Sequence, residues 1–377
     1  MGKKREGDLM KVPYLDLKLQ YLSIKEEINK EVLDTLKSSS YSLGPKVEAF
    51  ERNFSTYSNS KYTVGVNSGT SALHIALQSL DIGSGDEVIV PAMTFVATPM
   101  AVSYTGAKPV FVDTFYPSGL INFNKIEEKI TSRTKAIIPV HLYGQCADLI
   151  EIKKIAKKHK LKIIEDASQA HGSHQNDINI GQVSDAATYS FYPGKNLGAY
   201  GESGCATTNN QKLYKKMISL RNWGQKRKHF HDDISYNYRM DGIQGAILNV
   251  KLKKIDQWIE KRRKAANIYN EILNKELLKT TEEIGNYHVY HIYGIFLKNR
   301  DKLQNYLLKK NIFTGNHYPV PCHLQKPYTK FGYKKNDFPD SELIAKNQVS
   351  LPIYPEITEK MIEHVSLEIN KWTAKNS

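Results

Sequence analysis

The chain has 377 residues, more than one hydrophobic core usually supports, so we expect one large and one smaller domain. Hydrophobic residues make up 40% of the sequence and charged residues 24%, values that exclude a largely disordered chain. The net charge of +14 favours anionic ligands, but we expect no nucleic acid partner, because no known binding module and no run of five like charges is present.

Short apolar runs alternate with amphipathic stretches along the first two thirds of the chain. We predict strands and helices in alternation: strands over 62–66, 87–90, 109–112, 136–139, 162–164 and 187–191, and helices over 71–80, 124–130 and 149–159. The uncharged run 88–107 is nearly as long as a membrane span, but Pro91, Pro99 and Gly106 break it into strand, turn and helix, so we expect no membrane segment. The alternation predicts an α/β fold with a mainly parallel sheet covered by helices on both faces.

The pattern of apolar residues changes near Asp241. Apolar positions at three- and four-residue spacing predict a pair of long helices over 242–274. Beyond this pair we predict a strand over 289–296, a helix over 302–310 and a proline-rich loop over 317–328. We therefore divide the chain into a large domain, residues 1–245, and a small C-terminal domain, residues 246–377.

Ligands bind open α/β sheets beyond the carboxyl ends of the strands, so the polar residues that follow strands indicate the site. The first such segment is the turn from Asn67 through Ser68, Gly69 and Thr70 to Ser71, which leads from a strand into a helix. Its backbone amides and the positive end of the helix dipole suit a phosphate. A serine or threonine that merely caps the helix explains this turn equally well when it is taken alone.

Two further segments carry a carboxylate and a lysine. Asp166 ends a hydrophobic strand, where it is either a capping acid or a carboxylate that keeps a pyridine nitrogen protonated. Lys195 lies on a glycine-rich turn after the next strand, an unusual place because most lysines occupy solvated faces. A desolvated lysine amine suits Schiff-base chemistry. The two residues can face one site, and together they indicate such chemistry more strongly than either does alone.

The ordered motifs resemble the DegT/DnrJ/StrS family of sugar aminotransferases, which depend on pyridoxal 5′-phosphate (PLP) and have the type I fold of aspartate aminotransferase. The likeness runs from about Tyr14 to the C-terminus. Its landmarks are short segments spread along the chain: Leu43-Gly44-Pro45, 67–73, 91–98, Leu142-Tyr143-Gly144-Gln145, 163–172, 190–196 and 236–240.

The resemblance implies a role for each matching residue. Lys195 holds PLP covalently and shuttles the proton, Asp166 pairs with the ring nitrogen, and the cofactor alternates with pyridoxamine phosphate. Gln169 contacts the ring hydroxyl and Phe95 stacks on the ring. The phosphate is bound by Gly69, Thr70, Ser71 and Ser190 of one subunit and by Asn237 of the other, which implies a homodimer with shared sites. A lysine at position 195, where some relatives have histidine, favours an aminotransferase over a dehydratase.

The resemblance also implies the substrates. We expect L-glutamate as amino donor and a keto-sugar nucleotide as acceptor, with a 3-keto, dTDP- or UDP-linked sugar favoured. Residues expected to touch the sugar nucleotide are Tyr192, Lys226, His229, Arg239, His317, Tyr318, His323 and Gln325. For His323 and Gln325, packing within a proline-stiffened loop is an equally good explanation.

Two alternatives remain at this point. One is a 4-keto-sugar aminotransferase, and the other is a non-catalytic sensor or regulator that kept the PLP fold. A metal site is not expected. Residues 229–233 contain two histidines and two aspartates, but their spacing matches no known metal motif, so we interpret 226–231 as a mobile basic loop that meets the substrate's pyrophosphate. Cys146, Cys205 and Cys322 form no CxxC pair, which favours a reducing cytoplasm over a disulfide framework.

Overall fold

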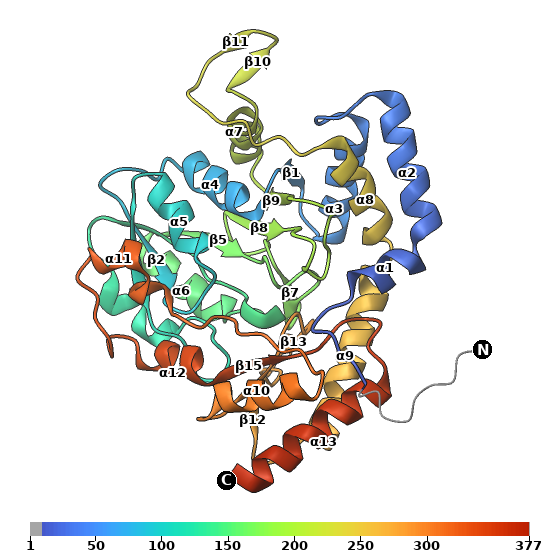
Figure 1. The fold of residues 1–377 in the computed structure, drawn as a ribbon. Helices are drawn as coiled ribbons and strands as arrows, with labels where there is room; N and C mark the ends of the chain where they lie inside the picture. The colour runs from blue at the N-terminus through green and yellow to red at the C-terminus, as the bar shows by residue number, and fades with distance from the viewer. Residues whose placement is uncertain (1–9, 377) are drawn as a thin grey trace.

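The computed structural model describes residues 10–376 and contains a central seven-stranded sheet (Figure 1). The strand order is β1-β9-β8-β5-β4-β2-β3, and β9 alone runs against the other six strands. The strands are β1 Tyr62–Val66, β2 Glu87–Pro91, β3 Lys108–Val112, β4 Thr134–Ile137, β5 Lys162–Asp166, β8 Ala186–Ser190 and β9 Gly204–Thr208. The predicted α/β fold with a mainly parallel sheet is therefore confirmed.

Helices cover both faces of this sheet because successive strand residues point to opposite sides. In β2, Val88 and Val90 pack into one core with α4, α5 and α7, while Ile89 packs into another core with α6. The helices of this part are α3 Pro45–Tyr57, α4 Gly69–Ser79, α5 Ala97–Tyr104, α6 Leu149–His159, α7 Gln211–Arg221 and α8 Gly242–Leu252. At one side lie α1 Leu17–Ser23 and α2 Lys25–Ser38.

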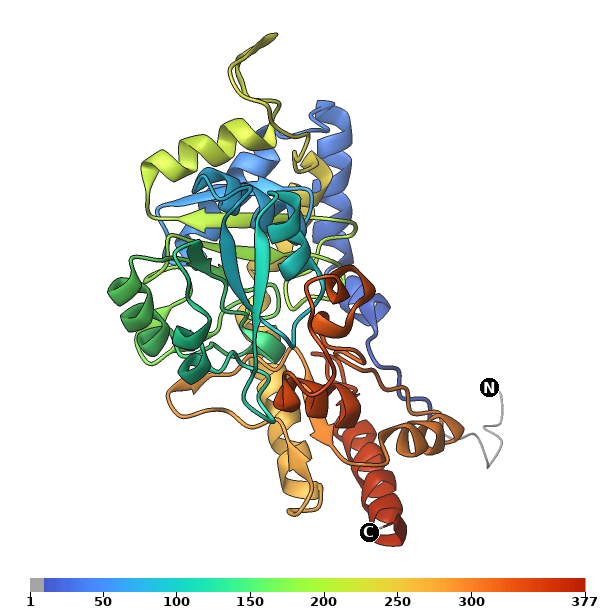
Figure 2. The ribbon, with the colours of Figure 1, turned by 90° about the vertical axis from the view of Figure 1, so that its left-hand side faces the viewer.

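The C-terminal part is built on a three-stranded antiparallel sheet of β12 Leu278–Lys279, β14 Tyr293–Phe296 and β15 Gln348–Leu351. Around it lie α9 Ile255–Ile272, α10 Arg300–Lys309, α11 Lys326–Thr329, α12 Pro339–Asn347 and α13 Glu359–Asn376. Val12 joins this core and pairs with Ile312, so the N-terminal segment crosses to the C-terminal part (Figure 2). The domain boundary predicted at residue 245 falls inside α8 and stays a prediction.

Two expectations about local structure are corrected. Residues 124–130 do not form one helix but two short 3-10 turns, Phe123–Lys125 and Glu127–Lys129, because only Ile126 of this stretch is fully buried and the segment lacks a continuous apolar face. The segment expected as a mobile loop forms a hairpin of β10 Gln225–Arg227 and β11 Phe230–His231 that projects from the body of the molecule (Figures 1 and 2). The remaining short elements are β6 His174–Gln175, β7 Ile178–Asn179, β13 Asn286–Tyr287 and the 3-10 turns Leu142–Gly144 and Cys322–Leu324.

Within residues 10–376, no helix combines the length and the apolar character needed to cross a membrane.

Candidate active site

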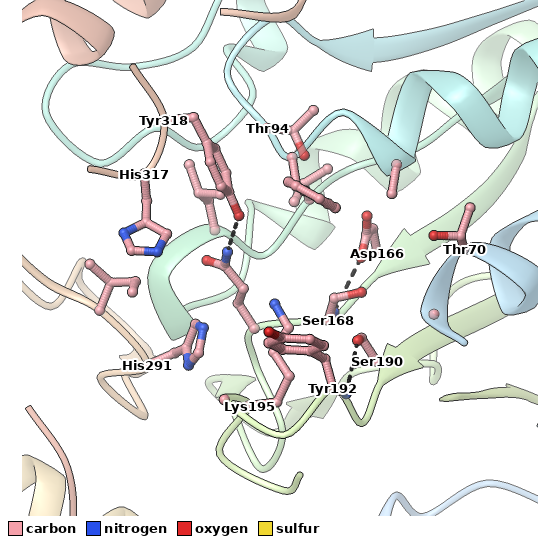
Figure 3. Close-up of a pocket in the computed structure, with 18 of the residues that line it drawn as sticks. Thr70, Thr94, Asp166, Ser168, Ser190, Tyr192, Lys195, His291, His317 and Tyr318 are labelled. Carbon is pink, nitrogen blue, oxygen red and sulfur yellow. Dashed lines mark hydrogen bonds between the residues drawn. The ribbon is translucent and has the colours of Figure 1, made fainter. Parts of the chain in front are cut away.

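A cavity of about 660 Å³ lies where β1, β5 and β8 end (Figure 3). Parallel strands of an open sheet bring the residues that follow them to the same edge, and ligands bind there. Ten of the residues expected at the site line this cavity: Gly69, Thr70, Phe95, Asp166, Gln169, Ser190, Tyr192, Lys195, His317 and Tyr318.

One end of the cavity is formed by the first turn of α4. Ser68 caps this helix by accepting a hydrogen bond of 3.0 Å from the Ser71 amide. The first amides of a helix have no partner inside the helix and attract anions. A Cβ added at Gly69 would lie 2.7 Å from the Cβ of Ser190, so only glycine lets this turn approach the end of β8. The amides of α4 and the Ser190 hydroxyl together form a cradle for an anion.

Asp166 is 4% exposed and lies in the wall of the cavity. One carboxylate oxygen accepts a hydrogen bond of 2.8 Å from Thr98 Oγ1, and the other accepts one of 3.2 Å from the Ser168 amide. Among residues 10–376 no cation lies within ion-pairing distance of this carboxylate. A buried carboxylate without a positive partner costs free energy. The site therefore favours a ligand that carries a cationic group.

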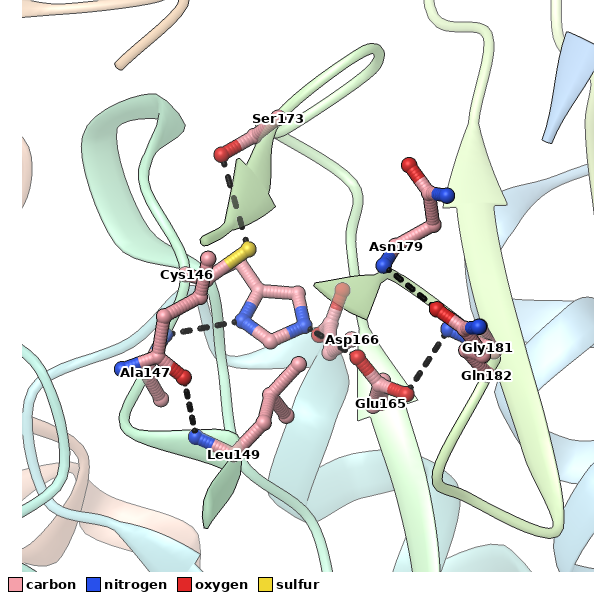
Figure 4. A network of polar contacts seen from close by, with 12 residues as sticks. Cys146, Ala147, Leu149, Glu165, Asp166, Ser173, Asn179, Gly181 and Gln182 are labelled. Atoms are coloured by element: carbon pink, nitrogen blue, oxygen red, sulfur yellow. Dashed lines mark hydrogen bonds and ion pairs between the residues drawn. The ribbon is translucent and has the colours of Figure 1, made fainter. Parts of the chain in front are cut away.

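The neighbouring residue, Glu165, anchors the same strand from its other face (Figure 4). Glu165 accepts hydrogen bonds of 2.8 Å from the Gly181 amide and from Nε2 of His141, and all of this pair is buried. Since the Ala147 amide donates to Nδ1 of His141, the proton of this histidine is on Nε2. The backbone at His141 also donates to the Asp166 carbonyl over 3.0 Å, which fixes the strand end that carries Asp166.

Lys195 follows β8 on a tight turn in which its amide donates to the Tyr192 carbonyl over 2.8 Å. Its side chain is half-buried and faces the cavity. Desolvation by the surrounding protein lowers the pKa of its amine to about 8, although the negative charge of Asp166 opposes this shift. An amine with such a pKa is partly neutral near physiological pH and can attack a carbonyl group.

Aromatic rings form the wall opposite Lys195. Phe95 is 53% exposed, and its ring centre lies 5.5 Å from that of Tyr318. Gln169 links the two sides of the wall, because its Nε2 donates to the Tyr318 hydroxyl over 2.9 Å and its Oε1 accepts from the Tyr143 amide over 2.7 Å. An exposed phenyl ring over the cavity offers a stacking surface for a flat ligand.

Seven expected residues do not reach the cavity of their own chain. The Ser71 hydroxyl donates to Asn67 at the start of α4, and His323 is buried against Phe338 and Glu342. Gln325 precedes α11 and lies outside the cavity lining. The other four lie on the projecting hairpin or on the segment that follows it: Lys226, His229, Asn237 and Arg239.

Several functional neighbours were not expected from the sequence. Thr98 reaches Asp166 from α5, and His291, Arg262 and Tyr14 line the cavity from distant parts of the chain. No sequence motif marks them, since their place depends on how α9 and the N-terminal segment pack against the sheet. The pattern around 289–296 indicated only a strand.

The four features of the cavity fit one type of cofactor. An anion cradle, an unpaired buried carboxylate, a reactive amine and an exposed aromatic face match the phosphate, the ring nitrogen, the aldehyde and the flat ring of PLP. The residues present therefore fit this group.

Comparisons with known proteins agree with this fit. Residues 22–370 match the DegT/DnrJ/EryC1/StrS aminotransferase family. A relative from Aneurinibacillus thermoaerophilus, dTDP-3-amino-3,6-dideoxy-alpha-D-galactopyranose transaminase, is 43% identical over 362 residues, which cover 96% of this chain and 99% of the relative. The pleiotropic regulatory protein of Geobacillus stearothermophilus is 44% identical over 360 residues, which cover 94% of this chain and 97% of that protein.

A solved structure gives the same answer. DesV from S. venezuelae has a TM-score of 0.94 and 38% sequence identity, and the alignment covers 96% of this chain and 98% of DesV. Other solved neighbours were determined with the cofactor in its PLP or pyridoxamine phosphate form. The chain therefore belongs to the DegT/DnrJ/EryC1/StrS aminotransferase family and is a PLP-dependent enzyme of the type I fold.

Proposed function

We propose that this enzyme transfers the amino group of L-glutamate to a 3-keto sugar linked to dTDP or UDP, in the synthesis of amino sugars for surface polysaccharide such as O-antigen or for glycosylated products. The observation that carries the proposal is the Lys195 amine facing the same cavity as the unpaired Asp166 carboxylate. The choice of sugar rests on the names of transaminase relatives, which contain dTDP or UDP and a 3-amino, 3-dehydro or 3-oxo position.

When bound, PLP supplies an aldehyde that carries the amino group and a ring that withdraws electrons from the reacting carbon. Lys195 holds the cofactor through its amine. The free Lys195 amine would act as the base that removes the proton from the donor's α-carbon and then as the acid that returns a proton in the transfer. With its lowered pKa, the amine is basic enough to take this proton, and a useful fraction of it is neutral near physiological pH.

Asp166 keeps the ring nitrogen protonated by pairing with it. Thr98 Oγ1 and the Ser168 amide hold both carboxylate oxygens in place, so the charge points at a fixed position. Phe95 would cover one face of the ring, and Gln169 would contact its hydroxyl.

We further propose a homodimer with shared sites, working in the cytoplasm. Gly69, Thr70 and Ser190 bind the phosphate, and Asn237 of the partner subunit completes the contact. Support comes from α1, α2, the projecting hairpin and the residues that flank this hairpin, which expose large apolar side chains: Leu19, Leu22, Leu33, Leu36, Trp223, Phe230 and Ile234. Exposed apolar surface of this kind marks an interface. The cysteines are buried and unpaired, which fits a reducing compartment.

For the substrate, we propose that Tyr192, His317 and Tyr318 contact the sugar, because they line the cavity near Lys195. Lys226 and His229 of the partner subunit meet the pyrophosphate, and Arg239 supports the strand pairing beside the phosphate turn. His323 packs against Phe338, and Gln325 precedes α11 outside the cavity lining.

The proposal is tested by adding glutamate to the PLP-loaded enzyme and recording its visible spectrum. Loss of the absorbance of the lysine-bound cofactor, followed by its return on addition of a 3-keto-sugar nucleotide, is the expected result. A protein that binds PLP but does not respond to glutamate would indicate a regulator instead. A return of the absorbance with a 4-keto sugar alone would overturn the assignment of the keto position.

A further inference from the structure

His291 lies in the wall of the active-site cavity but has no role in the transfer described above. It comes from the segment that enters β14, and Figure 3 shows its ring beside the Lys195 side chain. The residue is half-buried, so part of its ring is accessible from the cavity.

Hydrogen bonds fix the tautomer of this histidine. Nδ1 of His291 lies 3.1 Å from Oδ1 of Asn196, and the amide nitrogen of Asn196 donates to the Val289 carbonyl over 3.0 Å. Because the Asn196 amide is oriented in this way, its oxygen must accept, and the proton of the imidazole is on Nδ1. Nε2 therefore carries a lone pair, and within residues 10–376 it has no protein donor.

The backbone immediately before His291 has an unusual conformation. Tyr290, the preceding residue, has a φ of 42°, a left-handed value that is rare for an aromatic residue. Arg262 stabilises this bend by donating to the Tyr290 carbonyl over 3.2 Å, and the Tyr290 amide donates to His288 over 2.9 Å. Backbone strain that is held in this way concentrates at functional sites.

Burial, together with the neighbouring positive groups, lowers the pKa of His291 and favours the neutral ring. Burial lowers its pKa well below the usual value, and the cations Lys195 and Arg262 and the neighbouring His317 and His171 lower it further. Among the described residues, no carboxylate contributes to this shift. A neutral imidazole with Nε2 unprotonated is an acceptor and not a donor.

We propose that Nε2 of His291 accepts a hydrogen bond from a hydroxyl group of the keto-sugar and so selects the sugar substrate. This inference rests on the proposed function. Hydroxyl groups are the hydrogen-bond donors that a sugar ring presents. The nitrogen of the amino donor is the atom that is transferred, so it is not left free to bind His291. A hydrogen-bond acceptor held beside Lys195 thus recognises the sugar by its hydroxyl group while the lysine takes part in the transfer.

Two variants distinguish the role of the acceptor Nε2 from that of Nδ1. His291→Asn keeps an amide donor near the position of Nδ1, so the contact with Asn196 is retained, but the acceptor in the cavity is lost. His291→Gln extends an amide oxygen toward the position of Nε2 and restores this acceptor. Both variants are smaller than or similar in size to histidine, and cofactor absorbance and thermal unfolding report whether each is folded and loaded.

The measurement is calorimetric binding of the keto-sugar nucleotide that the wild-type enzyme turns over fastest, with the bare nucleoside diphosphate as control. We expect His291→Asn to raise the Kd of the sugar nucleotide about five- to tenfold, as for the loss of one neutral hydrogen bond, and to leave the Kd of the bare diphosphate unchanged. His291→Gln should recover at least half of the loss on a logarithmic scale. The rate of the glutamate half-reaction should stay within about twofold of wild type in both variants.

Equal weakening of the bare diphosphate, or an unchanged Kd for the sugar nucleotide in His291→Asn, would overturn the inference. A glutamate half-reaction that falls more than sugar binding would assign His291 to the amino donor and overturn it as well. If the wild-type enzyme turns over no keto-sugar nucleotide, the proposed function itself fails, and this outcome is visible before any variant is made.

Discussion

The chemical properties of Lys195 and Asp166 depend on the residues that surround them. Lys195 has an ordinary side chain, but desolvation gives its amine a pKa of about 8 and thus makes it a nucleophile. Asp166 is suited to a cationic ligand group, because Thr98 and Ser168 hold its oxygens while no cation of residues 10–376 lies within ion-pairing distance. A cationic ring nitrogen is the partner that this carboxylate lacks.

The pKa of Lys195 predicts how fast the apo-protein captures PLP at different pH values. Only the neutral amine reacts, and its fraction falls about tenfold for each pH unit below the pKa. We expect the rate of covalent capture, followed by stopped-flow absorbance, to rise up to about pH 8 and then to level off. A rate that continues to rise through pH 10 would show a lysine with an unshifted pKa and would contradict the desolvated site.

Thr98 offers a test of how Asp166 is positioned. Thr98→Val removes a hydrogen bond to a charged group, worth about 1.5–3 kcal/mol, so kcat should fall roughly ten- to a hundredfold. Asp166→Asn should retain PLP but reduce kcat by about a hundredfold or more. Thr105→Val, at the other end of α5, removes hydrogen bonds to the Val102 carbonyl and from the Ala107 amide, both remote from Asp166, and should leave kcat within about twofold. Steady-state kinetics with glutamate check all three, and equal rates for Thr98→Val and Thr105→Val would contradict this role.

At the scale of elements, the site depends on how closely α4 approaches the end of β8. Ser68 and Gly69 also lie against Gly204 of β9, where an added Cβ would meet the Ser68 backbone at 2.4 Å. Small residues on neighbouring elements therefore allow the helix start, the strand end and the anion cradle to occupy one place.

Gly69→Ala should weaken PLP binding by displacing α4 from Ser190. The added methyl group would lie 2.7 Å from the Ser190 Cβ, a distance that forces one of the two elements to move. We expect the Kd for PLP, measured by fluorescence titration, to rise at least about tenfold. Gly83→Ala is the matched control, because its Cβ would meet only the Thr105 carbonyl at 3.6 Å, and it should not change the Kd. Equal affinities of the two variants would show that this close approach does not form the phosphate site.

The sequence predicted those elements whose periodicity is strong. The strand over 62–66 matches β1, and the helix pair over 242–274 matches α8 and α9. Prediction was wrong for 124–130, where scattered apolar residues suggested a helix that the packing does not support. Thr98 and His291 could not be predicted, because a threonine on a helix and a histidine before a strand acquire their roles only through long-range packing against Asp166 and Asn196.

At the scale of the whole molecule, the proposed shared site requires two subunits. The hairpin and Asn237 lie away from the cavity of their own chain, and a role for them at an active site therefore needs a partner. Binding at a site formed only in the dimer is linked to assembly by mass action, so dilution should release PLP.

A mixed dimer of Lys195→Ala and Asn237→Ala subunits tests this arrangement. With shared sites, one of its two sites carries both changes and the other carries neither, so mixing the two weakened homodimers at limiting PLP should recover activity, up to one intact site per mixed dimer. If both residues served the site of their own chain, each site would carry one change, and activity would not exceed the average of the parents.

The central claim is that Lys195 enables amino transfer from glutamate to a keto-sugar nucleotide. The most direct measurement is mass spectrometry of the sugar nucleotide after incubation with ¹⁵N-labelled glutamate, comparing the wild-type enzyme with Lys195→Ala. We expect ¹⁵N in the sugar and an equal amount of 2-oxoglutarate for the wild-type enzyme, and neither product for the variant. Labelled sugar formed by Lys195→Ala at the wild-type rate, or no labelled sugar from any 3-keto or 4-keto nucleotide tested, would contradict it.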